Sequence, residues 1–134
     1  MAIVGLNFTK MMIEKKLPVT GKVSISNNVT IKDVKEAKLA IGGDQKAMKF
    51  TFQYTSKYEP GIGNIELNGE LVLLSDEKTA KEVLDSWKKN KSIPKEATNQ
   101  VMNNVLNKCN IQALILSKDL GLPAPIPLPK LKQQ

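Results

Sequence analysis

The side chains that could do chemistry in this chain are one cysteine, 13 carboxylates and 20 lysines, because histidine and arginine are both absent. Without histidine, a Ser–His or Cys–His catalytic couple is excluded, and zinc and transition metals lose their commonest protein ligand. Cys109 lies in a predicted helix beside Lys108, which could lower the pKa of the thiol. Free cysteine is more often a buried packing residue, and we favour that role. A lone cysteine is also typical of a reducing compartment and favours a cytoplasmic location.

The carboxylates have no spacing that indicates catalysis. Without histidine, acid–base chemistry would need a carboxylate pair or a lysine with a shifted pKa. Strand alternation and helix capping already explain the positions of Glu59, Glu66, Glu70, Asp76 and Glu77. The glycines of the 61–63 segment precede a strand, whereas a phosphate-binding loop precedes a helix N-terminus. The sequence predicts no enzyme activity, no cofactor and no metal site.

The lysines give a net charge of +7, which attracts phosphate without sequence specificity. A basic RNA- or ribosome-associated protein is therefore the alternative function. The lysines are spread along the chain, and no alternation of aromatic and basic residues marks a base-stacking platform. Scattered lysines also raise solubility, and we favour a solvated surface as their explanation.

The 134 residues suit one domain over 1–134, with strands in 2–74, helices in 76–119 and an arm in 121–134. No apolar run approaches the roughly 18–20 residues that span a bilayer. The first residues lack the basic leader and apolar segment of a signal peptide. We therefore expect no membrane insertion.

The stretch from Ala47 to Leu74 predicts a long β-hairpin. Apolar and polar residues alternate in both halves, as in strands with one buried and one solvated face. The apolar side carries Met48, Phe50, Phe52, Tyr54, Tyr58, Ile65, Leu67, Leu71 and Leu73. Residues 59–61, Glu-Pro-Gly, supply the turn. On the polar side, we expect cross-strand pairs of Lys49 and Lys57 with Glu66 and Glu70.

Residues 2–41 predict further strands of the same sheet. Val4, Leu6 and Phe8 alternate as in a strand, although residues 11–13 would also suit a short helix. A second strand carries Val23, Ile25, Val29 and Ile31, with Asn27-Asn28 as a turn or bulge, and a further short strand carries Ala37, Leu39 and Ile41. Four or five strands joined by short connections imply an antiparallel sheet.

Periodicity changes to that of helices after Leu74. Ser75 or Asp76 can cap a first helix over about 76–90, whose apolar stripe is Ala80, Val83, Leu84 and Trp87. A second helix begins with Ser92 as its cap and Pro94 in its first turn, and runs to about Lys118 with an interruption near Asn110. Its apolar residues repeat at every fourth position: Ala97, Val101, Val105, Cys109 and Ala113.

The chain after Gly121 alternates proline with apolar residues up to Pro129. Proline has no backbone N–H, so this segment is neither helix nor interior strand and is expected to be an extended arm. In water it would expose Leu122, Ile126 and Leu128. We therefore expect it to lie on an apolar surface, either of its own chain, which we favour, or of a neighbouring subunit.

Two segments resemble the SecB-like chaperones. In that family a Cys-Pro-x-Ile helix leads to a Gly-Phe-Pro-Pro-Leu-x-Leu-x-Pro tail. Here Cys-Asn-Ile at 109–111 is followed by Leu-Gly-Leu-Pro-Ala-Pro-Ile-Pro-Leu at 120–128. Val-Thr-Ile-Lys-Asp-Val at 29–34 is similar to the family's Ile-x-Val-Lys-Asp-Leu first strand. The order of antiparallel strands, two helices and a Pro-rich end also resembles this family.

This resemblance implies an α+β fold: an antiparallel sheet of four to five strands followed by two C-terminal helices and an extended Pro-rich arm. It also implies a tetramer, or dimer of dimers, that holds unfolded polypeptides along apolar grooves between sheet and helices, with no cofactor and no catalysis. The family's bacterial export chaperones are strongly acidic and dock an export motor through that charge. This chain differs, with a net charge of +7.

The sequence thus predicts a non-catalytic protein-binding module, a holdase whose partners are unfolded or partner polypeptides and further copies of the chain in a homodimer or homotetramer. The candidate binding residues are Phe50, Phe52, Tyr54 and Tyr58 of the hairpin and Leu122, Ile126 and Leu128 of the arm. Each of them would otherwise be an ordinary core residue beneath the helices. An apolar sheet face larger than its helix cover would favour the binding role.

Overall fold

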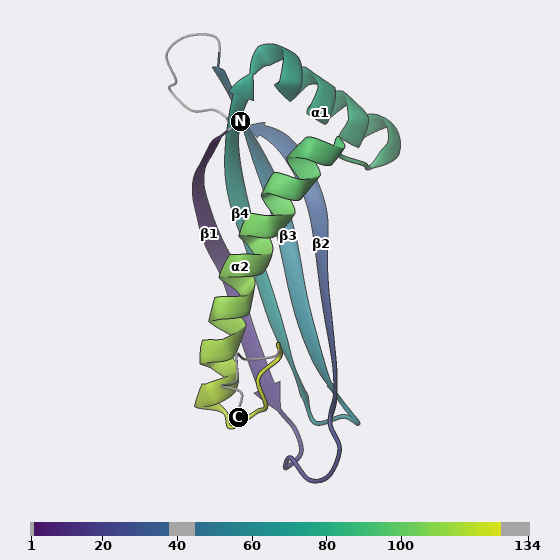
Figure 1. Ribbon diagram of the computed structural model, residues 1–134, viewed down its shortest axis with the longest axis vertical. Helices are drawn as coiled ribbons and strands as arrows, with labels where there is room; N and C mark the ends of the chain where they lie inside the picture. The colour runs from purple at the N-terminus through teal and green to yellow at the C-terminus, as the bar shows by residue number, and fades with distance from the viewer. Residues whose placement is uncertain (1, 38–44, 127–134) are drawn as a thin grey trace, which may run out of the picture.

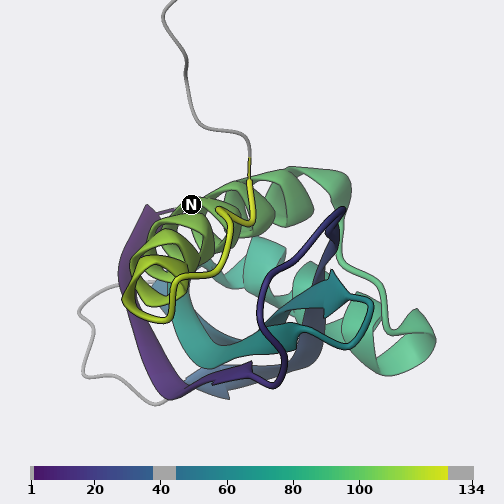
Figure 2. The same ribbon diagram turned by 90° about the horizontal axis from the view of Figure 1, so that it is seen from below.

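The computed structural model describes residues 2–37 and 45–126 (Figure 1). The strands are β1 (Ala2–Lys15), β2 (Ser24–Ala37), β3 (Gln45–Glu59) and β4 (Gly63–Asp76), and the helices are α1 (Glu77–Asn90) and α2 (Lys95–Asp119). The strands form one antiparallel sheet in the order β1-β4-β3-β2, so β1 and β2 are its edges. Both helices lie on one face of this sheet (Figures 1 and 2). The predicted α+β class is confirmed.

The hairpin predicted around residue 60 is confirmed as β3 and β4, which pair without a register shift. Gly61 in its turn has a φ of 60°, which glycine adopts without strain. The backbone N–H of Ile62 donates to the carbonyl of Tyr58 at 3.0 Å and closes the turn.

Only one of the expected cross-strand charge pairs forms. Lys49 Nζ lies 3.6 Å from a carboxylate oxygen of Glu70, as predicted. Lys57 is opposite Asn64 in the register. Glu66 instead pairs with Lys10 of the neighbouring strand β1 at 3.0 Å. The sequence of the hairpin therefore did not identify the partner of Glu66, because that partner belongs to a third strand.

The β1 segment is a strand throughout, including residues 11–13, and it carries two extra residues. The register shifts between Ile3 and Gly5 and again between Phe8 and Lys10. The expectation that Val4 shares a face with the next apolar residues is wrong, since the first bulge leaves its side chain 53% exposed. A bulge inserts one residue, so side chains beyond it change parity relative to the simple alternation.

The β2 segment is one strand that ends at Ala37. Of the residues predicted to form a further short strand, Ala37 belongs to β2, while Leu39 and Ile41 lie outside the described residues. The irregularity predicted at Asn27 and Asn28 is also absent there, because both residues pair regularly with β3. The register shift instead falls between Ile31 and Asp33.

Gly69 of β4 lies where adjacent strands approach closely. A Cβ at this position would meet the backbone oxygen of Asn7 and lie 2.6 Å from the ring Cζ of Phe52. Gly69→Ala is therefore expected to lower the free energy of unfolding by about 1–3 kcal/mol, because neither neighbour can move without disturbing the sheet. Urea unfolding followed by Trp87 fluorescence measures the change. Gly5→Ala is the control, since a Cβ there meets nothing within 4 Å; equal losses in both variants would contradict the explanation.

The helix boundaries depend on specific caps. Asp76, not Ser75, caps α1, because its carboxylate accepts from the backbone N–H of Thr79 at 3.0 Å. Hydrogen bonding from the side chain of Thr79, and then from its backbone N–H, lowers the pKa of Asp76. The prediction that Ser92 caps α2 is wrong: the N-cap is Pro94, whose side chain makes no capping hydrogen bond, while the Ser92 hydroxyl lies 3.2 Å from that of Ser86.

Helix α2 is continuous through Asn110, so the predicted interruption there is also wrong. The helix ends where Gly121 takes a φ of 67°. The backbone N–H of Leu122 donates to the carbonyl of Ser117 at 2.8 Å, which turns the chain back toward the sheet. Neither helix in the described ranges has the length and hydropathy needed to cross a membrane.

Candidate functional site

The aromatic residues of β3 lie in the core between sheet and helices. Phe50, Phe52, Tyr54 and Tyr58 are each at most 1% exposed. Phe52 contacts Phe8 of β1 edge-to-face, with ring centroids 6.1 Å apart. In the single chain, no part of the aromatic face of the hairpin is therefore left uncovered by the helices. The reason is the length of α2, which runs diagonally along the sheet (Figure 1).

The two tyrosines of this face, in the C-terminal half of β3, form hydrogen bonds through their hydroxyls. The hydroxyl of Tyr58 donates to the carbonyl of Pro123 at 2.7 Å, and that of Tyr54 lies 3.4 Å from the side-chain oxygen of Asn110. Burial raises the pKa of Tyr54 to about 12 and also raises the pKa of Tyr58. Both hydroxyls are therefore protonated near neutral pH and act as donors.

The described part of the arm, residues 121–126, packs against its own chain. Leu122 is 6% exposed and belongs to the core, and Pro125 is buried. The side-chain amide of Asn27 donates to the carbonyl of Pro125 at 2.7 Å. The buried hydroxyl of Ser56 in turn donates to the amide oxygen of Asn27 at 2.6 Å, which points the amide nitrogen toward the arm. Of the two surfaces considered for this arm, its described residues therefore use their own sheet and helix.

A hollow of about 340 Å³ adjoins the arm, and we name it the β2–α2 hollow. Its lining is neutral and comes from strands β2 and β3, helix α2 and the arm: Asn27, Asn28, Val29, Tyr54, Leu106, Asn110 and Ile126. The structure thus brings together Tyr54, Tyr58, Leu122 and Ile126 of the predicted set. Phe50 and Phe52 are buried further along β3, and Leu128 lies outside the described residues.

Sequence reasoning missed the polar members of this site. Asn27 was expected only as a turn or bulge residue, and Asn110 only as a helix interruption. The amide-rich composition of α2 was the available signal, but it did not distinguish the half-buried Asn110 from exposed neighbours such as Asn107.

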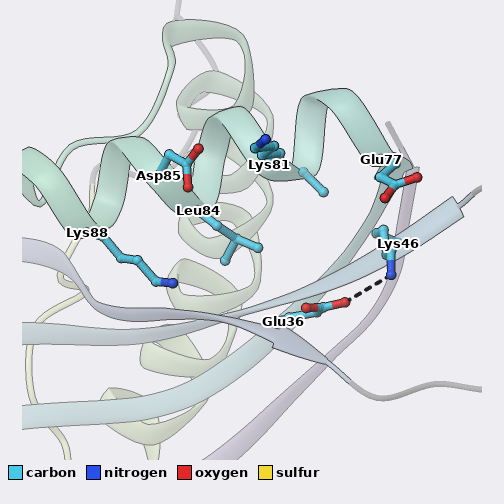
Figure 3. Close-up of a pocket in the computed structure, with 8 residues that line it drawn as sticks. Glu36, Lys46, Glu77, Lys81, Leu84, Asp85 and Lys88 are labelled. Atoms are coloured by element: carbon cyan, nitrogen blue, oxygen red, sulfur yellow. Dashed lines mark ion pairs between the residues drawn. The ribbon is translucent and has the colours of Figure 1, made fainter.

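A second hollow, of about 230 Å³, lies between α1, the C-terminal end of β2 and the N-terminal end of β3 (Figure 3). Its charged lining residues alternate in sign: Glu36, Lys46, Glu77, Lys81, Asp85 and Lys88. Lys46 Nζ lies 3.3 Å from Glu36. Among the residues described, no group of three or more Asp, Glu, Cys or His side chains could hold a metal ion. Because positive and negative side chains both line this hollow, it does not favour binding of an anion or of a cation.

Four lysines of the sheet form ion pairs with carboxylates. Ion pairs of 3.0–3.6 Å join Lys10 to Glu66, Lys35 to Asp33, Lys46 to Glu36 and Lys49 to Glu70. The ring of Trp87 has Lys91 Nζ 5.4 Å from its centroid, but the side chain is only 7% exposed and cannot stack on a base. The paired lysines of the sheet and the burial of Trp87 therefore add no support to the nucleic-acid alternative.

Comparison with known proteins gives a likeness of fold. No family model matches the chain, and no curated protein matches it by sequence. The solved structure of the SecB-like chaperone Rv1957 of Mycobacterium tuberculosis, in complex with a ChAD peptide from the antitoxin HigA1, is similar over 99% of this chain and 91% of that chain. The TM-score is 0.58 and the sequence identity is 11%. The chain therefore has a SecB-like fold.

Within this SecB-like fold, the thiol of Cys109 is a packing group. It is fully buried on α2, and this burial raises its pKa to about 12. We expect an aromatic disulfide reagent to label the native protein more than about a hundredfold more slowly than the urea-unfolded chain. Comparable rates in both states would contradict this packing role.

Ionisation of Tyr54 and Cys109 should destabilise the fold in alkali. Burial raises the pKa of each from its ordinary 10.0 or 9.0 to about 12. The folded state therefore holds protons that the unfolded chain releases, so this stabilisation is complete below about pH 9 and is lost as the pH rises to about 12. The urea midpoint should fall over this range, and Tyr54→Phe should reduce the slope. A constant midpoint would contradict the assignment.

Proposed function

We propose that this chain is a non-catalytic holdase that binds non-native or partner polypeptides through apolar surface. The observation that carries the proposal is its SecB-like fold, shared with a chaperone solved in complex with a peptide. The arm supports it, because the chain already seats a non-helical apolar segment between its sheet and α2. Binding such a segment requires apolar side chains along its path and hydrogen-bond donors for its backbone. The path of the arm, beside Asn27, Tyr58 and the β2–α2 hollow, has both, and we name it the track.

The proposed binding residues are those of the sequence prediction, with the roles that their burial allows. Tyr54, Tyr58, Leu122 and Ile126 border the β2–α2 hollow or the arm beside it. Phe50 and Phe52 form the apolar floor beneath the helices. Leu128 continues the arm sequence and remains part of the proposal.

The direct test is suppression of aggregation. A chemically unfolded polypeptide is diluted into buffer with increasing amounts of this protein, and turbidity is followed with time. We expect less turbidity at substoichiometric amounts, whereas an unrelated folded protein of similar size and positive charge should have no effect. No suppression by a chain shown by circular dichroism to be folded would overturn the proposal.

We also propose that the protein works as a homodimer or homotetramer in the cytoplasm. Both edge strands are 14 residues long and have unpaired backbone groups along one side, a feature that favours pairing with another chain. Apolar side chains add to the exposed surface: Val4 at 53%, Met11 at 47%, Ile111 at 59% and Ile115 at 49%. Light scattering should give twice or four times the chain mass of 14.8 kDa, and a monomer would overturn this part.

A further inference from the structure

We infer that residues 122–126 are an intramolecular ligand that occupies the track. An extended apolar segment of another polypeptide, with prolines at the same spacing, binds in the track after it displaces these residues. This inference rests on the proposed function, and it adds the chemistry of the bound segment and the element that controls access. Three features of the arm and its surroundings carry it.

The first feature is the spacing of the buried anchors. Leu122 and Pro125 are buried, while Pro123 and Ala124 between them are half-buried. An extended proline-rich chain has three residues per turn, so residues three apart lie on the same side. The arm therefore presents one apolar edge to the protein, as a segment of any other chain with the same spacing would.

The second feature is the direction of the hydrogen bonds. The track offers donors, namely the Tyr58 hydroxyl to the carbonyl of Pro123 and the Asn27 amide to the carbonyl of Pro125. Proline brings a carbonyl but no N–H. A non-proline residue at either position would bring an N–H that must find a partner or lose its hydration at a cost. The track therefore favours ligands with prolines two residues apart.

The third feature is unused space. Ile126 is one of the residues that line the β2–α2 hollow, whose volume is about 340 Å³. Val29 and Leu106 give that hollow apolar walls, and no charged residue lines it. A longer bound segment would thus place a further neutral, apolar side chain there.

The test uses a fluorescent peptide with the sequence of residues 121–128, Gly-Leu-Pro-Ala-Pro-Ile-Pro-Leu, and measures its binding to the full chain by anisotropy. Docking of the arm reduces the fraction of chains with a free track, so weakening it must tighten peptide binding. We expect Ile126→Ser to bind the peptide at least about threefold more tightly than the unaltered chain, and Leu122→Ser more tightly still. Ile126 is only half-buried, so its variant decides the test if Leu122→Ser does not fold.

Two controls define specificity. Asn107→Ser, on the exposed face of α2, should bind the peptide as the unaltered chain does. A peptide with all three prolines replaced by alanine should bind at least about fivefold more weakly. Equal peptide affinity for the unaltered chain and Ile126→Ser, or equal affinity for the two peptides, would overturn the inference.

The aggregation assay on the same proteins separates the two proposals. Suppression of aggregation together with a failed peptide test would overturn the role of the arm and leave the holdase function standing. Peptide binding with the expected pattern, but without suppression by any variant, would support the proline-spaced track and overturn the holdase function.

Discussion

Replacing Phe52 with alanine is expected to lower the free energy of unfolding by about 3–5 kcal/mol. The side chain has no exposed surface, and its ring contacts Phe8 of β1 edge-to-face across Gly69 of β4. Truncation removes this aromatic contact and leaves a cavity that the flanking strands cannot close. Since small proteins are stable by only about 5–15 kcal/mol, much of the total would be lost. Urea unfolding followed by Trp87 fluorescence measures the effect.

The control for Phe52→Ala is Lys57→Ala on the same strand. Lys57 is exposed on the other face of the sheet and should change stability by no more than about 0.5 kcal/mol. The comparison also separates two roles for the aromatic face. If Phe52→Ala left stability unchanged and weakened only the binding of unfolded polypeptides, the burial described for the single chain would be contradicted.

Replacing Leu106 with aspartate is expected to weaken binding of an unfolded polypeptide by at least about tenfold, which corresponds to about 1.4 kcal/mol. Leu106 is half-buried on α2 and forms an apolar wall of the β2–α2 hollow. A carboxylate there would have to lose hydration whenever an apolar segment covered it, and no lysine lines the hollow to compensate. Titration of a labelled unfolded polypeptide by anisotropy measures the change.

The matched control is Ile111→Asp, which places the same charge on the outer face of the same helix. Ile111 is 59% exposed and does not line the hollow, so binding should remain within about twofold of the unaltered chain. Light scattering of both variants should accompany the titration, because a change in assembly would alter the number of sites. Loss of binding in Ile111→Asp but not in Leu106→Asp would move the site to the exposed face of α2.

The two expectations follow from one property of the molecule. The apolar side chains of the hairpin β3–β4 are fully buried within the single chain, so they supply stability and no ready surface for another protein. Another polypeptide could reach the apolar interior only at the end of the sheet where α2 ends and the arm passes beside it (Figure 2). A holdase built in this way would bind its polypeptide in place of its own arm.

The sequence by itself determined the fold class. Alternation from Met48 to Tyr58 and the turn beginning at Glu59 are local patterns, and they sufficed to predict the hairpin and its buried side. The change to helical periodicity after Leu74 likewise predicted both helices within a few residues of their observed ends. The absence of histidine and arginine is also a property of the sequence alone, and it restricts the chemistry that this chain could perform in any fold.

Only the tertiary structure decided the bulges in β1 and β2, the complete burial of the aromatic face and the position of the arm. Each of these depends on partners that are distant in sequence: a bulge is defined by the opposite strand, and burial by the length and direction of α2. The contact between Asn27 and Pro125 joins residues 98 positions apart. A local pattern has no information about such pairs, because their geometry exists only once the sheet, α2 and the end of the chain have packed together.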